Sequence, residues 1–185
     1  MKCSMTHFTS IVLTVFLGVS SPVYASPIDT LFNTGVDSAG AVLPDGTIGD
    51  PHYSLIPPVP TDSTAETRIR TSAGGFPIPP YIGDNTLSSW IGPNNDGELN
   101  GPSGTYTYRT TFDLTGFASN TASITGQWST DDDGLDILIN GTSLGYTNSS
   151  FSTFSQFLIT SDFVSGINTL DFKVNNGGGP TALRV

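Results

Sequence analysis

The chain has 185 residues, a formal net charge of −10 and 12% charged residues. This negative charge excludes nucleic acid and anionic membrane surfaces as natural partners, because both are polyanions. The length is enough for one domain with a core of its own, and the single cysteine, Cys3, excludes an internal disulfide.

Residues 1–25 are predicted to be a secretory signal peptide. Lys2 precedes an apolar run over 8–19, and Ala25 ends a segment with small residues where a signal peptidase reads. The apolar run is shorter than the roughly 20 residues that span a bilayer, and Cys3 lies before it, where no lipid would be attached. We therefore expect residues 26–185 to be one secreted domain, extracellular or at the cell surface, with no transmembrane segment.

The first half of the mature chain alternates strand and turn signals, and it contains no predicted helix. A proline-rich loop over 74–85 and a long polar loop over 92–104 interrupt the pattern. Strands are predicted, in chain order, over 31–35, 51–56, 67–70 and 86–90.

The second half alternates more regularly. Apolar residues at every second position predict strands with one buried face, and Trp128 is in phase with that face. Strands are predicted over 105–114, 122–128, 135–139, 154–160, 168–174 and 181–185. The residues predicted to face inward on the first and fifth of these are Tyr106, Tyr108, Phe112, Leu114, Leu170, Phe172 and Val174.

A hairpin is predicted around Asn140 and Gly141. Both residues tolerate positive φ, which a type I′ turn requires. Before the turn, Leu135, Ile137 and Ile139 are expected to share the buried face. Short strands at this spacing predict an all-β fold, an antiparallel β-sandwich of the jelly-roll type.

The segment from Trp128 to Gly145, with its run of aspartates and its Asn-Gly turn, resembles the hairpin of galactose-binding-like β-jelly-roll domains. These are sugar-binding modules that accompany many secreted glycosidases. Together with the motifs over 32–46, 105–114 and 168–185, it is similar to exported bacterial proteins of the PEP-CTERM type, whose ectodomains are often such jelly rolls. The chain departs from that family in lacking its C-terminal Pro-Glu-Pro sorting tail, so the resemblance does not imply surface sorting.

A glycan site is predicted in the loop that follows Trp90. An aromatic ring can stack on the C–H face of a sugar while amides and carboxylates bind its hydroxyls. Arg109 and Gln127 point away from the predicted inner face and could line a concave outer surface. The alternative is a solvated loop, with Trp90 plugging the edge of the core. The candidate glycan-binding residues are Trp90, Asn94, Asn95, Asp96, Arg109 and Gln127.

A calcium site is the second prediction. Four carboxylates within six residues, Asp131, Asp132, Asp133 and Asp136, repel one another unless a cation, solvent or turn amides stabilise them. Calcium prefers such oxygen ligands. The segment does not match the EF-hand loop, and the alternative is a structural cap between two strands.

No catalytic constellation is recognisable, so we do not predict an enzyme. His52 is the one histidine after residue 25, and no nucleophile or metal-binding motif accompanies it. Two functions of different class remain. The leading one is a secreted, non-catalytic protein that binds polysaccharide or another glycan, with calcium as a stabilising ion. The alternative is a structural component of an extracellular matrix or envelope with no soluble ligand.

Overall fold

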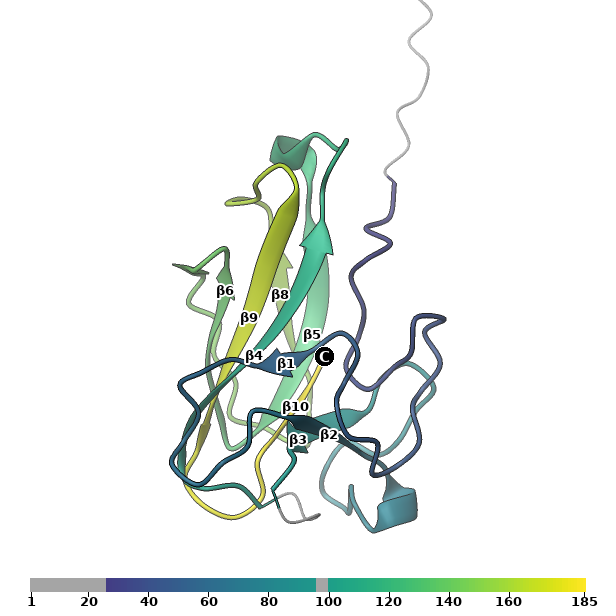
Figure 1. The fold of residues 1–185 in the computed structure, drawn as a ribbon, viewed down its shortest axis with the longest axis vertical. Coiled ribbons are helices and arrows are strands. Elements are labelled where there is room, and N and C mark those ends of the chain that lie inside the picture. The colour runs from purple at the N-terminus through teal and green to yellow at the C-terminus, as the bar shows by residue number, and fades with distance from the viewer. Residues whose placement is uncertain (1–25, 96–99) are drawn as a thin grey trace, which may run out of the picture.

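The computed structural model describes residues 26–95 and 100–185 and has the predicted all-β architecture. Two five-stranded antiparallel sheets pack face to face as a jelly-roll sandwich (Figure 1). The first sheet has the order β1 (Ser54–Leu55), β4 (Gly104–Asp113), β9 (Ile167–Asn176), β6 (Asp133–Ile139) and β7 (Thr142–Ser143). The second has the order β2 (Thr67–Arg70), β3 (Trp90–Pro93), β10 (Ala182–Arg184), β5 (Ile124–Asp131) and β8 (Ser155–Ile159).

Helical structure in the described residues is limited to two short 3₁₀ turns, η1 (Ser72–Gly74) and η2 (Ser119–Thr121). No helix of the described chain is long and apolar enough to cross a membrane. The predicted signal peptide, 1–25, lies outside the described residues.

The core lies between the sheets, and the alternating strands supply it as predicted. β4 and β9 pair along their full length (Figure 1), and each turns every second side chain inward. The inward-facing residues predicted on these two strands and after β4 are all buried, and so is Trp128 of β5. Trp128 and Phe172 meet across the core with ring centroids 5.9 Å apart.

The hairpin prediction is confirmed at the turn and wrong at one inward position. Asn140 and Gly141 both have positive φ. Leu135, however, is 42% exposed. A register shift between Gly134 and Asp136 inserts an extra residue and turns Leu135 outward. Gly134 takes the inward position instead, where a Cβ would lie 2.4 Å from Cη2 of Trp128.

Two of the strands predicted in the first half of the chain also differ from the strands in the structure. The segment over 31–35 forms no strand, and its neighbourhood holds only an isolated bridge between Val36 and Val42. The strand predicted over 86–90 begins at Trp90 and is buried on both faces. Such a strand has no alternating pattern, because neither of its faces meets solvent.

The second face of β3 is buried by residues 71–88, which we call the strap. The strap connects β2 to β3 and covers the outer face of the second sheet at β3 and β10. A second apolar cluster forms beneath it, in which Trp90 and Ala182 of the sheet pack against Phe76, Tyr81, Ile82 and Phe151. Sequence periodicity gives no sign of this layer, because the strap itself is irregular.

Arg184 anchors the strap. Its side chain is fully buried, and its guanidinium donates hydrogen bonds to Ser88 Oγ, Ser88 O and Gly83 O at 3.0, 2.6 and 2.9 Å. A buried guanidinium is tolerated when its donors are used in this way. The carbonyls it binds belong to the segment that closes over Trp90.

Candidate functional site

Trp90 does not offer a ring face to solvent. Its side chain is fully buried, its Nε1 donates to Ile82 O at 2.9 Å, and the rings of Phe76 and Tyr81 pack edge-on against it. The predicted sugar-stacking platform is therefore wrong for this residue. Its alternative, a tryptophan that fills apolar space, is what the structure contains.

Asn94 and Asn95 tie their loop to the segment before β2. Oδ1 of Asn95 accepts from Thr64 N at 3.2 Å, and Asn94 accepts from Arg68 and donates to Glu66 at 3.3 Å each. Their amides are thus already engaged. Asp96, the fourth candidate of this loop, lies outside the described residues.

Arg109 and Gln127 lie on opposite sides of the sandwich. Arg109 is on β4 and forms two hydrogen bonds of 2.6 Å to the carboxylate of Asp171 on β9. Gln127 is on β5, in the other sheet, and is exposed opposite Gln156 of β8. Both side chains point away from the core, so one ligand cannot contact both, and the predicted shared face does not exist.

The first aspartate of the acidic turn binds the strap. The carboxylate of Asp131 is buried and accepts a hydrogen bond of 2.5 Å from the hydroxyl of Tyr81. Burial, together with the neighbouring charge of Asp132, raises the pKa of Asp131 to about 6, although the Tyr81 hydrogen bond acts in the opposite direction. The same burial and the hydrogen bond to Asp131 raise the pKa of Tyr81.

The other three carboxylates of the turn bind other groups or face solvent. Asp132 accepts from Gly177 N at 2.7 Å. Asp136 accepts from Ser143 Oγ at 2.5 Å and Gly145 N at 2.9 Å, while Asp133 is exposed. Among residues 26–95 and 100–185, no three acidic, histidine or cysteine side chains converge as a metal site would require. Turn amides and hydroxyls thus stabilise most of these charges, and the structure does not test the calcium site that the sequence predicts.

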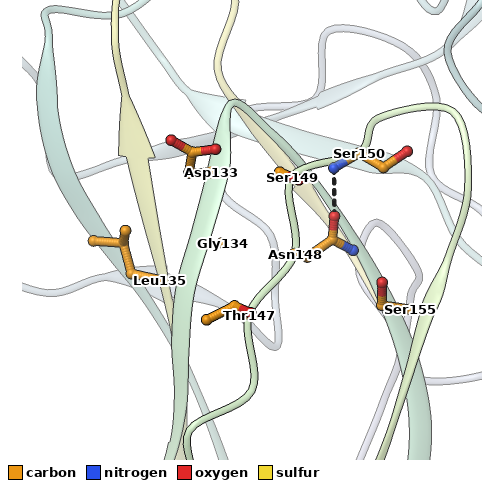
Figure 2. Close-up of a pocket in the computed structure, with 8 residues that line it drawn as sticks. All are labelled: Asp133, Gly134, Leu135, Thr147, Asn148, Ser149, Ser150 and Ser155. Carbon is orange, nitrogen blue, oxygen red and sulfur yellow. Dashed lines mark hydrogen bonds between the residues drawn. The ribbon is translucent and has the colours of Figure 1, made fainter.

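A polar pocket lies beside the acidic turn, where the first residues of β6 face the 147–150 segment and the start of β8 (Figure 2). Its volume is about 440 Å³, within the range of small-molecule sites. It is lined by Asp133, Gly134, Leu135, Thr147, Asn148, Ser149, Ser150 and Ser155.

Asn148 holds the 147–150 segment in place. It forms a bridge with Gly134 of β6, and its buried amide donates to Trp128 O at 2.8 Å. Its Oδ1 accepts from Ser150 N at 2.6 Å, the bond drawn in Figure 2. The position of the segment is therefore determined by the core strands β5 and β6.

The remaining polar side chains of the pocket are unused within the described chain. The carboxylate of Asp133 and the hydroxyls of Thr147, Ser149 and Ser155 form no hydrogen bond or ion pair with any described residue. Leu135 adds apolar surface at the rim. Such a lining can accept and donate hydrogen bonds to a polyhydroxyl ligand while an apolar side chain contacts its C–H groups.

The sequence analysis assigned Asp133 to a calcium site, and it did not identify the hydroxyl groups that line this pocket. Serine and threonine are frequent along the chain, so nothing in their local pattern distinguishes Thr147, Ser149 or Ser155. The sequence feature closest to the pocket is the run of aspartates before Gly134, which marks where β6 begins.

No protein-family model matches the chain, and no curated protein matches it. A search of solved structures finds "Structure of CBM35 from Paenibacillus barcinonensis", with 18% sequence identity and a TM-score of 0.38 over 76% of this chain and 97% of that chain. This likeness is too distant to assign a ligand, and the PEP-CTERM resemblance stays a prediction.

Proposed function

We propose that this protein is a secreted, non-catalytic β-sandwich that binds a neutral glycan in the pocket beside the acidic turn. The observation that carries the proposal is the set of unused polar side chains, Asp133, Thr147, Ser149 and Ser155, around a pocket of about 440 Å³. Sugar hydroxyls donate to carboxylates and exchange hydrogen bonds with hydroxyls, so this set matches their chemistry.

The negative charge of Asp133 and of the whole chain favours a neutral sugar over an anionic one. Asp133 has no described cation as a partner, and the chain carries a net charge of −10. A uronate or sulfated sugar would place a second negative charge beside Asp133, which is unfavourable. A neutral hexose or a short neutral oligosaccharide meets no such repulsion.

The test is a glycan array followed by calorimetric titration with the neutral sugar that binds best. Asp133→Asn is expected to weaken binding about tenfold or more, because a hydrogen bond to a charged group contributes about 1.5–3 kcal/mol. Asp29→Asn, at an exposed position outside the pocket, is the matched control and should bind like the parent chain.

Two results would contradict the proposal. Preferential binding of uronates would contradict the charge argument. Silence across the array would favour the alternative, a structural component of an extracellular matrix or envelope.

A further inference from the structure

β8 (Ser155–Ile159) forms one outer edge of the second sheet, and among the strands of the described chain it is the longest at an outer edge. The first sheet ends on two-residue strands, β1 and β7. The outer edge of β2 is covered by residues 46–49, which bond to the backbone of Thr67 and Ile69. Because an uncovered strand edge offers N–H and C=O groups to any strand that meets it, β8 is the edge most open to pairing with another chain.

The sequence of β8 favours such pairing. Residues 154–160, Phe-Ser-Gln-Phe-Leu-Ile-Thr, combine aromatic and β-branched residues with no charge, no proline and no glycine. This composition is typical of segments that stack as cross-β strands. The longer stretch 137–161 also contains no charged residue. Two copies that met at this edge would therefore face no charge repulsion there, although the chain as a whole carries a net charge of −10.

Two residues of β8 direct their backbone groups to the outer edge. Leu158 bonds there to the hydroxyl of Tyr146. Residues two apart in a strand face the same edge, so Gln156 faces it as well, and no described residue hydrogen-bonds to its backbone on that side. In two β8 strands related by a twofold axis at Phe157, Gln156 of each copy would lie opposite Leu158 of the other.

The Tyr146 hydroxyl already occupies the pairing groups of Leu158. It donates to Leu158 O at 2.7 Å and accepts from Leu158 N at 3.1 Å. These are the two backbone groups that a neighbouring strand would use. The ring of Tyr146 packs edge-on against Phe157, with ring centroids 6.2 Å apart. One side chain of the same molecule thus takes the place of a neighbouring strand at the centre of this edge.

The segment that carries Tyr146 is attached to the other sheet. Leu144 N donates to Ile137 O of β6 at 3.0 Å, and Asn148 forms a bridge with Gly134 of the same strand. Tyr146 lies between these two attachments, so its backbone is held on β6 while its hydroxyl reaches β8. The fold of the domain therefore holds the hydroxyl over Leu158.

We propose that Tyr146 is an edge-blocking residue, whose hydroxyl occupies the pairing groups of Leu158 and prevents β8 from pairing with β8 of a second copy. The contact is autoinhibitory, because the same edge without the hydroxyl is free to form a twofold dimer. Charged residues and proline commonly protect edge strands, and β8 contains neither. The role is independent of the proposed glycan binding, since Ser155 alone belongs to both β8 and the pocket.

The first test is Tyr146→Phe, which keeps the ring on Phe157 and removes the hydroxyl. In sedimentation velocity without any sugar, this variant should sediment as a dimer at protein concentrations where the parent chain stays monomeric. Tyr106→Phe is the matched control, because its hydroxyl also donates to a backbone carbonyl, Pro102 O at 2.7 Å. The control should stay monomeric, and dimerisation of both variants would overturn the proposal by making loss of stability the cause.

A proline substitution tests where the copies pair. Leu158→Pro removes the N–H that the open edge would offer, and proline is tolerated on an edge strand where its nitrogen faces outward. Added to Tyr146→Phe, it should restore the monomer. Leu158→Ala added to Tyr146→Phe keeps the N–H and should still dimerise. A dimer that persists with Leu158→Pro would place the contact on another surface and overturn the proposal.

Hydrogen exchange tests the contact in the parent chain, so the proposal can be overturned even if Tyr146→Phe does not fold. The amide of Leu158, bound to the hydroxyl, should exchange about tenfold or more slowly than the amide of Gln156. Equal exchange rates would show that the hydroxyl does not hold the edge in solution. A folded Tyr146→Phe that stays monomeric at every concentration would likewise show that this residue does not block pairing.

Discussion

The hydroxyl of Tyr81 donates a 2.5 Å hydrogen bond to the carboxylate of Asp131, fifty residues further along the chain. Tyr81 belongs to the strap and Asp131 ends β5, so the bond joins the irregular outer layer to the second sheet. Tyr81 also stacks on Phe151 at 4.4 Å between ring centroids. The acidic turn thus contributes to the closure of the second apolar cluster.

Asp131→Asn is predicted to stabilise the fold at neutral and alkaline pH. The pKa of this carboxyl rises from 3.8 to about 6 on folding, so the folded state disfavours the ionised form. Its contribution to stability is present below about pH 4 and is lost as the pH rises through 6. Asparagine carries no charge and keeps an oxygen for Tyr81.

Urea unfolding of both proteins at pH 4 and pH 8 measures the effect. We expect Asp131→Asn to gain up to about 3 kcal/mol at pH 8 and much less at pH 4. The prediction would be wrong if the variant were less stable than the parent chain at pH 8. Tyr81→Phe, which removes the hydrogen bond and keeps the charge, should be destabilised at both pH values.

Arg184→Met is predicted to release the strap. The variant leaves Ser88 O and Gly83 O without their buried donor, at a cost of about 1–3 kcal/mol for each unsatisfied group. Chymotrypsin should then cut within the strap, after Tyr81, much faster than in the parent chain. Urea unfolding gives the accompanying loss of stability.

The control is Arg109→Met. Arg109 binds the carboxylate of Asp171 and not the strap, its side chain is 35% exposed, and surface ion pairs contribute about 0–1 kcal/mol. Equal proteolysis of the two variants would show that Arg184 does not anchor the strap.

Calcium is predicted to leave the melting temperature unchanged, contrary to the sequence expectation. Asp131, Asp132 and Asp136 bind three different partners, Tyr81, Gly177 and the Ser143–Gly145 turn. A calcium ion needs six to eight oxygens around one point. Differential scanning fluorimetry with millimolar CaCl₂ and with chelator measures this, and a rise with calcium that Asp133→Asn abolishes would restore the metal site.

The sequence predicts the strands that have one face in the core and one in solvent. β4 and β9 are of this kind, and their inward residues follow directly from alternation. Trp90 could not be placed in this way, because the strap that buries it returns from elsewhere in the chain. Leu135 could not be placed either, because the bulge that turns it outward depends on pairing between β6 and β9.

The candidate site was harder to predict for the same reason. Its acidic residue, Asp133, stands out in the sequence, but its hydroxyls belong to a segment held by Asn148 through a bond to Trp128 O. That bond joins positions twenty residues apart, and the sequence gives no sign of it. The alternation of apolar residues along a strand predicts which side chains face inward. A pocket depends instead on which distant segments of the chain come together in the fold.

Gly134→Ala is predicted to destabilise the protein by about 1–3 kcal/mol, the usual cost of inserting a methyl group into a packed core. Its Cβ would lie 2.4 Å from Cη2 and 2.6 Å from Cζ3 of Trp128, and this indole is fully buried in the core. Gly83→Ala is the control, since its Cβ would meet nothing within 4 Å, and it should change stability by less than about 0.5 kcal/mol. Urea unfolding measures both, and near-UV circular dichroism reports the displaced tryptophan. Equal stability of the two variants would mean that the bulge in β6 can shift, so that Gly134 is not held against Trp128.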